Sequence, residues 1–233
     1  TDRAGFTGNS AQLPARLFSH NDQQSTWMSF APEGSQLGWG GRFGDATISG
    51  NAQSVFSQIS LGGNTVFLTG NQVSPFQISA SGVPAIRIIE AAPQQLKATV
   101  RDHFESAGSN RSNLFERDFI DLSRVSLAAN DTLDAALQSG SSVNTPFTAS
   151  GLGAQLQAVA QTIAVRDTLG ASRQVFFVSL GGFDTHSTQA ADLPGLQQDI
   201  SDSLAAFYTA TEELGVANQV TAFTAADFGR TLT

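Results

Sequence analysis

Two short stretches toward the C-terminal end of the chain carry side chains that can bind a metal ion. Asp184-Thr185-His186 places a carboxylate and an imidazole two residues apart, and Asp227 adds a second carboxylate. These groups suit zinc, or a harder divalent ion such as manganese or calcium. Asp184, His186 and Asp227 are therefore candidate metal ligands. The alternative is structural: His186 caps the next helix, and Asp184 accepts backbone N–H bonds in a turn.

A second candidate cluster is the sequence SHND at positions 19–22. If Ser19 caps a helix, its hydroxyl lies at the positive end of the helix dipole, where anions bind and the pKa of a nucleophile falls. Ser19 and His20 are therefore candidate catalytic residues, and the alternative is an ordinary N-cap followed by an exposed histidine. A triad of Ser19, His186 and Asp227 would compete for the same residues. However, the chain lacks the nucleophile-elbow pattern, and nothing in the sequence places Ser19 beside His186.

A strand, a helix and a second strand are predicted to position the metal candidates. Val175–Leu180 is an unbroken apolar run followed by two glycines, which is typical of a strand buried on both faces. Gln189–Leu214 has helical periodicity and is followed by Gly215, a common helix stop. Val220–Ala225 is a second apolar run that ends just before Asp227. Such a unit has parallel strands whose carboxyl ends share one edge, so we expect the three candidate ligands to meet there.

The rest of the chain indicates one α/β domain spanning residues 1–233. Residues 16–18 form a possible short strand before the helix that Ser19 would cap. Between 51 and 90, short apolar runs separated by Gly and Pro predict an excursion of short strands and turns. Helices are expected over 110–138 and 152–169, where apolar residues recur at helical spacings.

Composition excludes several classes of function. The chain of 233 residues has a net charge of −8, which would repel a nucleic-acid backbone or an anionic lipid surface. There is no cysteine, so disulfides, cysteine nucleophiles and thiolate metal sites are excluded. No apolar stretch is long enough to cross a bilayer. Both ends interrupt expected structure, which predicts a fragment of a longer chain.

Several motifs resemble an uncharacterised bacterial family that is typically exported by the twin-arginine route. They are VFFVSLGGFDTHSTQ with the helix after it, TAFTAADFGRTLT, LFSHNDQQSTWM and GWGGRFGD, and together they span residues from about 17 to 231. That family belongs to the alkaline phosphatase/sulfatase superfamily. The resemblance implies a mostly parallel sheet sandwiched by helices, alkaline-phosphatase-like and incomplete at both ends here, with divalent metals at the carboxyl edge.

The resemblance also implies roles for individual residues. Asp184 and His186 match the metal-binding motif, whereas Asp227 stands where the family more often has Glu. Ser19 and His20 match a Ser-His motif without indicating which is the nucleophile. The function implied is a periplasmic or secreted metal-dependent hydrolase of phosphate or sulfate esters. The alternative is a secreted non-catalytic binding or structural protein on a hydrolase-like scaffold.

Overall fold

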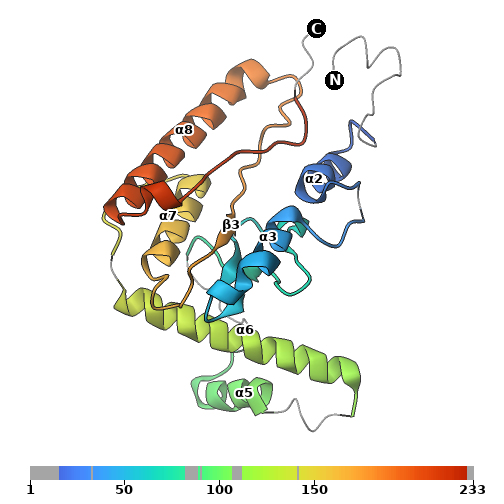
Figure 1. The fold of residues 1–233 in the computed structure, drawn as a ribbon, viewed down its shortest axis with the longest axis vertical. Coiled ribbons are helices and arrows are strands. Elements are labelled where there is room, and N and C mark those ends of the chain that lie inside the picture. Colours follow the sequence, from blue (N-terminus) through green and yellow to red (C-terminus); the bar gives the residue numbers. More distant parts are fainter. Residues whose placement is uncertain are drawn as a thin grey trace.

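A small parallel sheet lies at the centre of the protein (Figure 1). The computed structural model describes residues 16–32, 34–81, 89, 91–106, 112–140 and 142–229. The strands are β1 (Gln58–Ser60), β2 (Phe76–Gln77) and β3 (Val175–Phe177), and their order in the sheet is β2-β1-β3. Both pairings are parallel, with Ile59 opposite Phe76 on one side and Phe176 on the other. The predicted α/β class with a parallel sheet is therefore confirmed.

Helices supply most of the remaining ordered structure. The α-helices are α2 (His20–Ser29), α3 (Trp39–Thr47), α5 (Gln94–Ser106), α6 (Leu114–Ser139), α7 (Gly151–Ala164) and α8 (Gln189–Glu213). The short 3-10 helices are η1 (Ile48–Gly50), η2 (Ser54–Ser57), η3 (Val66–Leu68) and η5 (Ala217–Gln219). Helices α6, α7 and α8 confirm three of the ranges predicted from periodicity, and Gly215 follows α8 with a left-handed φ of 67°. Within the described ranges, no helix has both the length and the apolar character needed to cross a membrane.

Helices cover both faces of the sheet (Figure 1). The packing of successive β3 side chains shows which helices lie on which face. Phe176 packs into an apolar core that α7 and α8 share. Val175 and Phe177 point the other way and pack on a core built from α2, Trp39 and η3. This alternation is the period-2 pattern of a strand. Helix α6 adds Leu133 to a third core, beneath β1 and β2.

The predicted second strand, Val220–Ala225, is wrong. This segment follows η5 and, in the described part of the chain, belongs to no strand; from Thr221 to Ala226 its residues are exposed. Two of its six residues are alanines and two are threonines, which bury little apolar area, and Phe223 is 58% exposed, so little burial favours a strand here. Only Val220 joins the core of α7 and α8. The strand predicted at 175–180 is also shorter than expected, because pairing stops at Phe177.

The excursion at 51–90 is only partly made of strands. In its described part the strands are β1 and β2, while the apolar run at 66–68 forms the 3-10 helix η3. The apolar run at 85–89 lies almost entirely outside the described residues. Residues 16–18 form a turn, so the short strand predicted there is wrong.

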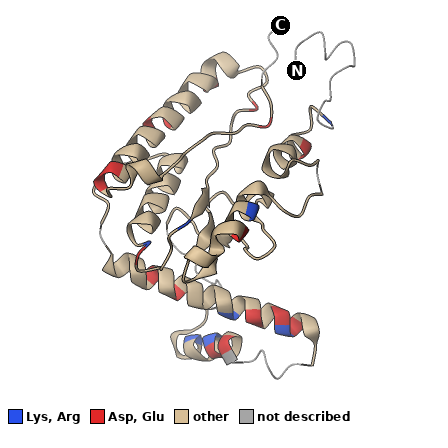
Figure 2. Cartoon of the chain, in the orientation of Figure 1, with Lys and Arg blue, Asp and Glu red and all other residues tan. Residues whose placement is uncertain are grey.

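Helices α5 and α6 form an arm that carries many of the charges (Figure 2). Arg101 on α5 contacts Glu105 on the same helix at 2.7 Å and also pairs with Asp131 on α6. On α6, Arg124 and Asp121 pair at 3.3 Å. Exposed ion pairs of this kind contribute little to the free energy of folding. The helix α5 was not predicted, although Leu96, Val100 and Phe104 recur at a spacing of four along it.

Glu213, the last residue of α8, fastens the loop that leads into α7. Its two carboxylate oxygens accept four hydrogen bonds, two from Asn144 and two from Thr145, at 2.7–2.9 Å. These bonds favour the ionised form, and the hydroxyl of Thr145 contributes most, so the pKa of Glu213 falls to about 2.

The pH dependence of Glu213→Ala follows from that lowered pKa. A carboxyl with a lowered pKa stabilises the fold above its unfolded value of 4.5, and this contribution disappears as pH falls toward about 2. We expect the variant to melt at a lower temperature than the wild type near pH 7, with a difference that shrinks between pH 4.5 and 2. Melting curves across this range measure it. Glu212→Ala, one residue away and exposed, is the control; an equal loss in both variants would contradict the assignment.

Candidate functional site

The N-terminus of α2 presents His20 to the site. Ser19 is the N-cap, as predicted, and its hydroxyl accepts a hydrogen bond from the backbone N–H of Asp22 at 3.3 Å. The Asp22 carboxylate is buried and lies 3.5 Å from the guanidinium of Arg16. Because the cap fixes where the helix starts, it also fixes the direction of the His20 side chain.

Asp184 and His186 lie on the extended chain that follows β3. The side-chain amide of Gln155 on α7 bonds both the N–H and the carbonyl of Ser179, at 3.0 and 2.9 Å. This pair of bonds replaces the missing strand partner after Phe177 and keeps the chain extended as far as the two glycines before Asp184. His186 then adopts a left-handed conformation with φ 45°. Histidine occurs there more often than most non-glycine residues, at a modest energetic cost.

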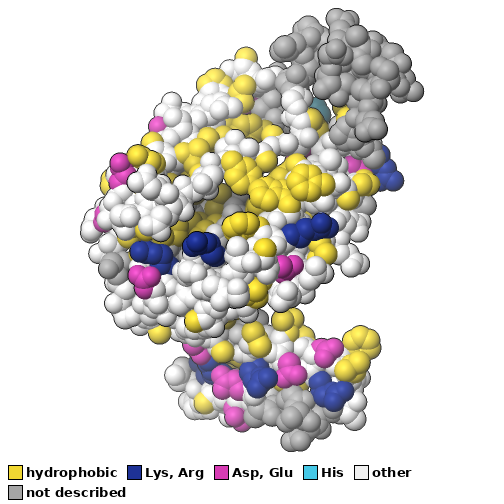
Figure 3. Space-filling model, in the orientation of Figure 1, with side chains coloured by type: hydrophobic (Ala, Val, Ile, Leu, Met, Phe, Trp, Pro, Cys, Tyr) yellow, Lys and Arg dark blue, Asp and Glu magenta, His cyan; other side chains and the backbone are white. Residues whose placement is uncertain are grey.

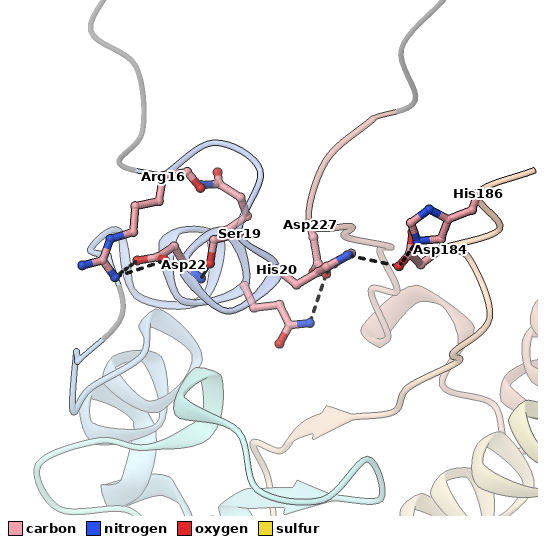
Figure 4. Close-up of polar contacts among 9 residues, drawn as sticks. Arg16, Ser19, His20, Asp22, Asp184, His186 and Asp227 are labelled. Atoms are coloured by element: carbon pink, nitrogen blue, oxygen red, sulfur yellow. Dashed lines mark hydrogen bonds and ion pairs between the residues drawn. The ribbon is translucent and has the colours of Figure 1, made fainter.

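Four side chains form one connected polar network, Asp227–His20–Asp184–His186 (Figure 4). The Nδ1 atom of His20 lies 2.7 Å from Oδ2 of Asp227. Its other ring nitrogen, Nε2, lies 3.6 Å from Oδ2 of Asp184. The same Asp184 oxygen is 3.0 Å from Nε2 of His186. Residues separated by about 200 positions in the sequence therefore meet in one place, and His20 connects the two carboxylates.

The expected convergence of Asp184, His186 and Asp227 is only partly met. Asp227 reaches the other two through His20 instead of facing them around one point. Among the described residues, no three His, Asp or Glu side chains form a ready-made metal cage. That Asp184, His186 and Asp227 bind a metal therefore stays a prediction. What is observed is that the three side chains lie in one polar network with His20.

The structural alternative for Asp184 and His186 does not describe what is seen. The residue at the N-cap of α8 is Thr188, not His186. The partners of the Asp184 carboxylate in the described part of the chain are the imidazoles of His20 and His186 rather than backbone N–H groups. The Asp184 carboxylate therefore lies between two imidazoles.

Ser19 is placed as a cap and not within the network. Figure 4 shows its side chain next to Asp22, whereas His20 reaches toward Asp227. The helix N-terminus does lie near Asp184, because His20 contacts that residue. Of the two candidate catalytic residues, His20 is therefore the one that the structure brings to the metal candidates.

The surroundings of His20 favour its protonated form. The hydrogen bond to Asp227 raises the pKa of His20 above its usual value, and the negative charges of Asp227 and Asp184 add to the shift. Partial removal from water opposes it. The imidazole is 46% exposed, so it remains accessible from solvent.

Aromatic side chains hold the segment that carries Asp227, which pairs with no strand among the described residues. The ring of the next residue, Phe228, packs on the His20 ring with centroids 4.6 Å apart. Earlier in the segment, Phe223 contacts Trp39 and Phe67 with centroids 5.5 and 6.4 Å apart. Apolar side chains gather on this face, where the 220–229 segment runs between α8 and α3 (Figure 3). Aromatic contacts therefore hold this segment in place, where strand pairing was expected to hold it.

One further polar contact was missed from the sequence. Nε2 of Gln24 donates to the Asp227 oxygen that also faces His20, at 3.1 Å. Gln24 stands four residues after His20 on the predicted helix, so the two share one face. That spacing was the available signal, but nothing local indicated that a residue 203 positions away would meet it.

Comparison with known proteins places the chain in a family. No match was found among curated proteins or among solved structures. One family profile, described as "Protein of unknown function (DUF1501)", matches residues 4–233. Because this match covers nearly the whole chain, the protein belongs to the DUF1501 family.

Proposed function

We propose that the protein is an exported, metal-dependent hydrolase of phosphate or sulfate esters with an alkaline-phosphatase-like fold. The observation that carries the proposal is the Asp227–His20–Asp184–His186 network beside a parallel sheet. Ligands in such sheets bind beyond the carboxyl ends of the strands, and Asp184 follows β3 there. The resemblance of its motifs to the alkaline phosphatase/sulfatase superfamily supports the same reading.

The donor groups fit a divalent ion. Two carboxylates and imidazole nitrogens are ligands that zinc and manganese accept, and the carboxylates also suit calcium. Two atoms bonded to one tetrahedral zinc at about 2.0–2.1 Å stand roughly 3.3 Å apart. The 3.0 Å between Asp184 Oδ2 and His186 Nε2 is close to that separation. Asp184 and His186 would therefore hold the ion, with Asp227 as a further ligand.

The charge of the site gives a physical reason for a metal. Asp184 and Asp227 bring two carboxylates to a part of the molecule where an anionic ester would have to bind. Like charges at such distances repel, and the repulsion grows when water is excluded. When bound, a divalent ion would offset this charge, polarise the ester oxygens and lower the pKa of a water molecule.

In the proposed mechanism, His20 transfers the proton. Asp227 holds its Nδ1, which leaves Nε2 on the side of Asp184. In the proposed reaction, a water molecule attacks phosphorus or sulfur and the ester bond to the leaving oxygen breaks. The protonated imidazole gives its Nε2 proton to that oxygen, and the proton lost by the water restores the imidazolium. General acid–base catalysis of this kind contributes about 10²–10⁴-fold.

A hydrolysis assay tests the proposal. The purified protein is incubated with an aryl phosphate and an aryl sulfate, first as isolated, then after chelator treatment, then with zinc, manganese or calcium restored. We expect turnover of at least one ester, loss with chelator and recovery with one of the metals. Turnover that chelator leaves unchanged would contradict the metal dependence. Stoichiometric metal without turnover of either ester would favour the non-catalytic alternative.

Export rests on the family resemblance. Fractionation of cells that carry the native gene locates the protein; recovery from the cytoplasm alone would contradict export.

A further inference from the structure

We infer that Gln24 is a positioning residue that orients the Asp227 carboxylate for metal binding. The inference deepens the proposed function and rests on it. It starts from the contact of the Gln24 amide with Asp227 Oδ2, at 3.1 Å. Gln24 is an exposed residue on α2 and belongs to none of the three cores, so packing does not account for its conformation.

Asp227 needs such support because its backbone is unpaired. Residues 220–229 carry no strand pairing in the described part of the chain, so no ladder fixes the direction of the Asp227 side chain. Contacts from α2 fix it instead. His20 and Gln24 stand four residues apart, which places them one above the other on the same face of the helix.

Both contacts from α2 reach the same oxygen. His20 Nδ1 and Gln24 Nε2 lie 2.7 and 3.1 Å from Asp227 Oδ2. Within the described residues, the other oxygen, Oδ1, has no hydrogen-bond partner of its own. A carboxylate with one oxygen held by two groups and the other uncommitted is oriented to bind a cation through the uncommitted oxygen. Hydrogen bonds of this kind, to ligands rather than to the metal, tune metal sites elsewhere.

Metal affinity measures how much Gln24 contributes to metal binding through Asp227. The affinity of the purified protein for zinc and manganese is determined by competition with a chromophoric chelator for the wild type, Gln24→Ala and Asn21→Ala. Asn21 is the matched control, because it is an exposed amide on the same helix. We expect Gln24→Ala to weaken binding about 10–100-fold, the usual cost of losing a group that orients a ligand, and Asn21→Ala to leave it unchanged. Equal affinities in all three proteins would overturn the inference.

A second readout does not need the metal. The side-chain NH₂ resonances of Gln24 are identified as those missing from the Gln24→Ala spectrum, and their positions are compared in metal-free wild type and Asp227→Ala. We expect them to shift when Asp227 is removed. If the protein binds no metal but shows this shift, the proposed function is contradicted, while the contact between Gln24 and Asp227 is confirmed. Stoichiometric metal with unchanged affinity in Gln24→Ala and no shift would sink the inference alone.

Discussion

Replacing Asp184 with alanine is expected to remove metal-dependent hydrolysis while leaving the fold intact. Asp184 lies on an extended segment after β3, is about half exposed and joins none of the cores. Its carboxylate contacts both His20 and His186. Losing a metal that polarises the ester costs several kcal/mol of transition-state stabilisation, or about a thousandfold in rate.

The measurement compares kcat/KM for the best ester in wild type, Asp184→Ala and Asp202→Ala. Asp202 is an exposed aspartate on α8, away from the network, and its replacement keeps the same change in net charge. Asp202→Ala should retain wild-type activity, and circular dichroism should show equal folding of all three proteins. An Asp184→Ala variant with undiminished activity would reduce Asp184 to a structural carboxylate.

Among the substitutions proposed here, Gly41→Ala is expected to lower the free energy of unfolding the most. Gly41 is buried on α3, in the glycine-rich motif beside Trp39, where the helix lies against the chain after η3. A Cβ at Gly41 would stand 2.1 Å from the carbonyl carbon of Thr69 and 2.4 Å from the backbone nitrogen of Gly70. Backbone atoms cannot yield as a flexible side chain can. Overpacking usually costs 1–3 kcal/mol, and we expect about 3 kcal/mol or more here.

A glycine in open space provides the matched control. Gly195 lies inside α8, and a Cβ there would meet no atom within 4 Å. Gly195→Ala should raise stability by up to about 1 kcal/mol, because alanine is the better helix former. Urea titration of the three proteins measures both effects, and the expected signs are opposite. Similar stabilities for Gly41→Ala and wild type would mean that α3 does not pack as closely as described.

The glycine motif also shows what sequence reasoning could not reach. GWGGRFGD contributed to the family resemblance, and no role in packing was expected for its glycines. The structure shows that Gly38 and Gly41 let α3 approach the backbone at Val66 and Thr69. That role depends on a contact between segments far apart in the chain, which local patterns do not encode.

Elements that depend on local rules were predictable, and those that depend on distant partners were not. Ser19 as an N-cap and the extent of α8 follow from side-chain type and helical spacing, and both are confirmed. Val220–Ala225 was expected to be a strand, but a strand needs a partner edge, and this segment packs through Phe223 instead. Likewise, the residue types of the network were recognised, whereas its linkage through His20 required the folded chain.

Elemental analysis of the purified protein tests the proposed metal site most directly. The protein is isolated without added chelator, dialysed against metal-free buffer and analysed for zinc, manganese and calcium together with sulfur, beside Asp184→Ala prepared in the same way. The proposal predicts at least one divalent ion per chain in the wild type and its loss from Asp184→Ala. A wild-type protein without stoichiometric metal, which also fails to bind any of the three ions on titration, would contradict it.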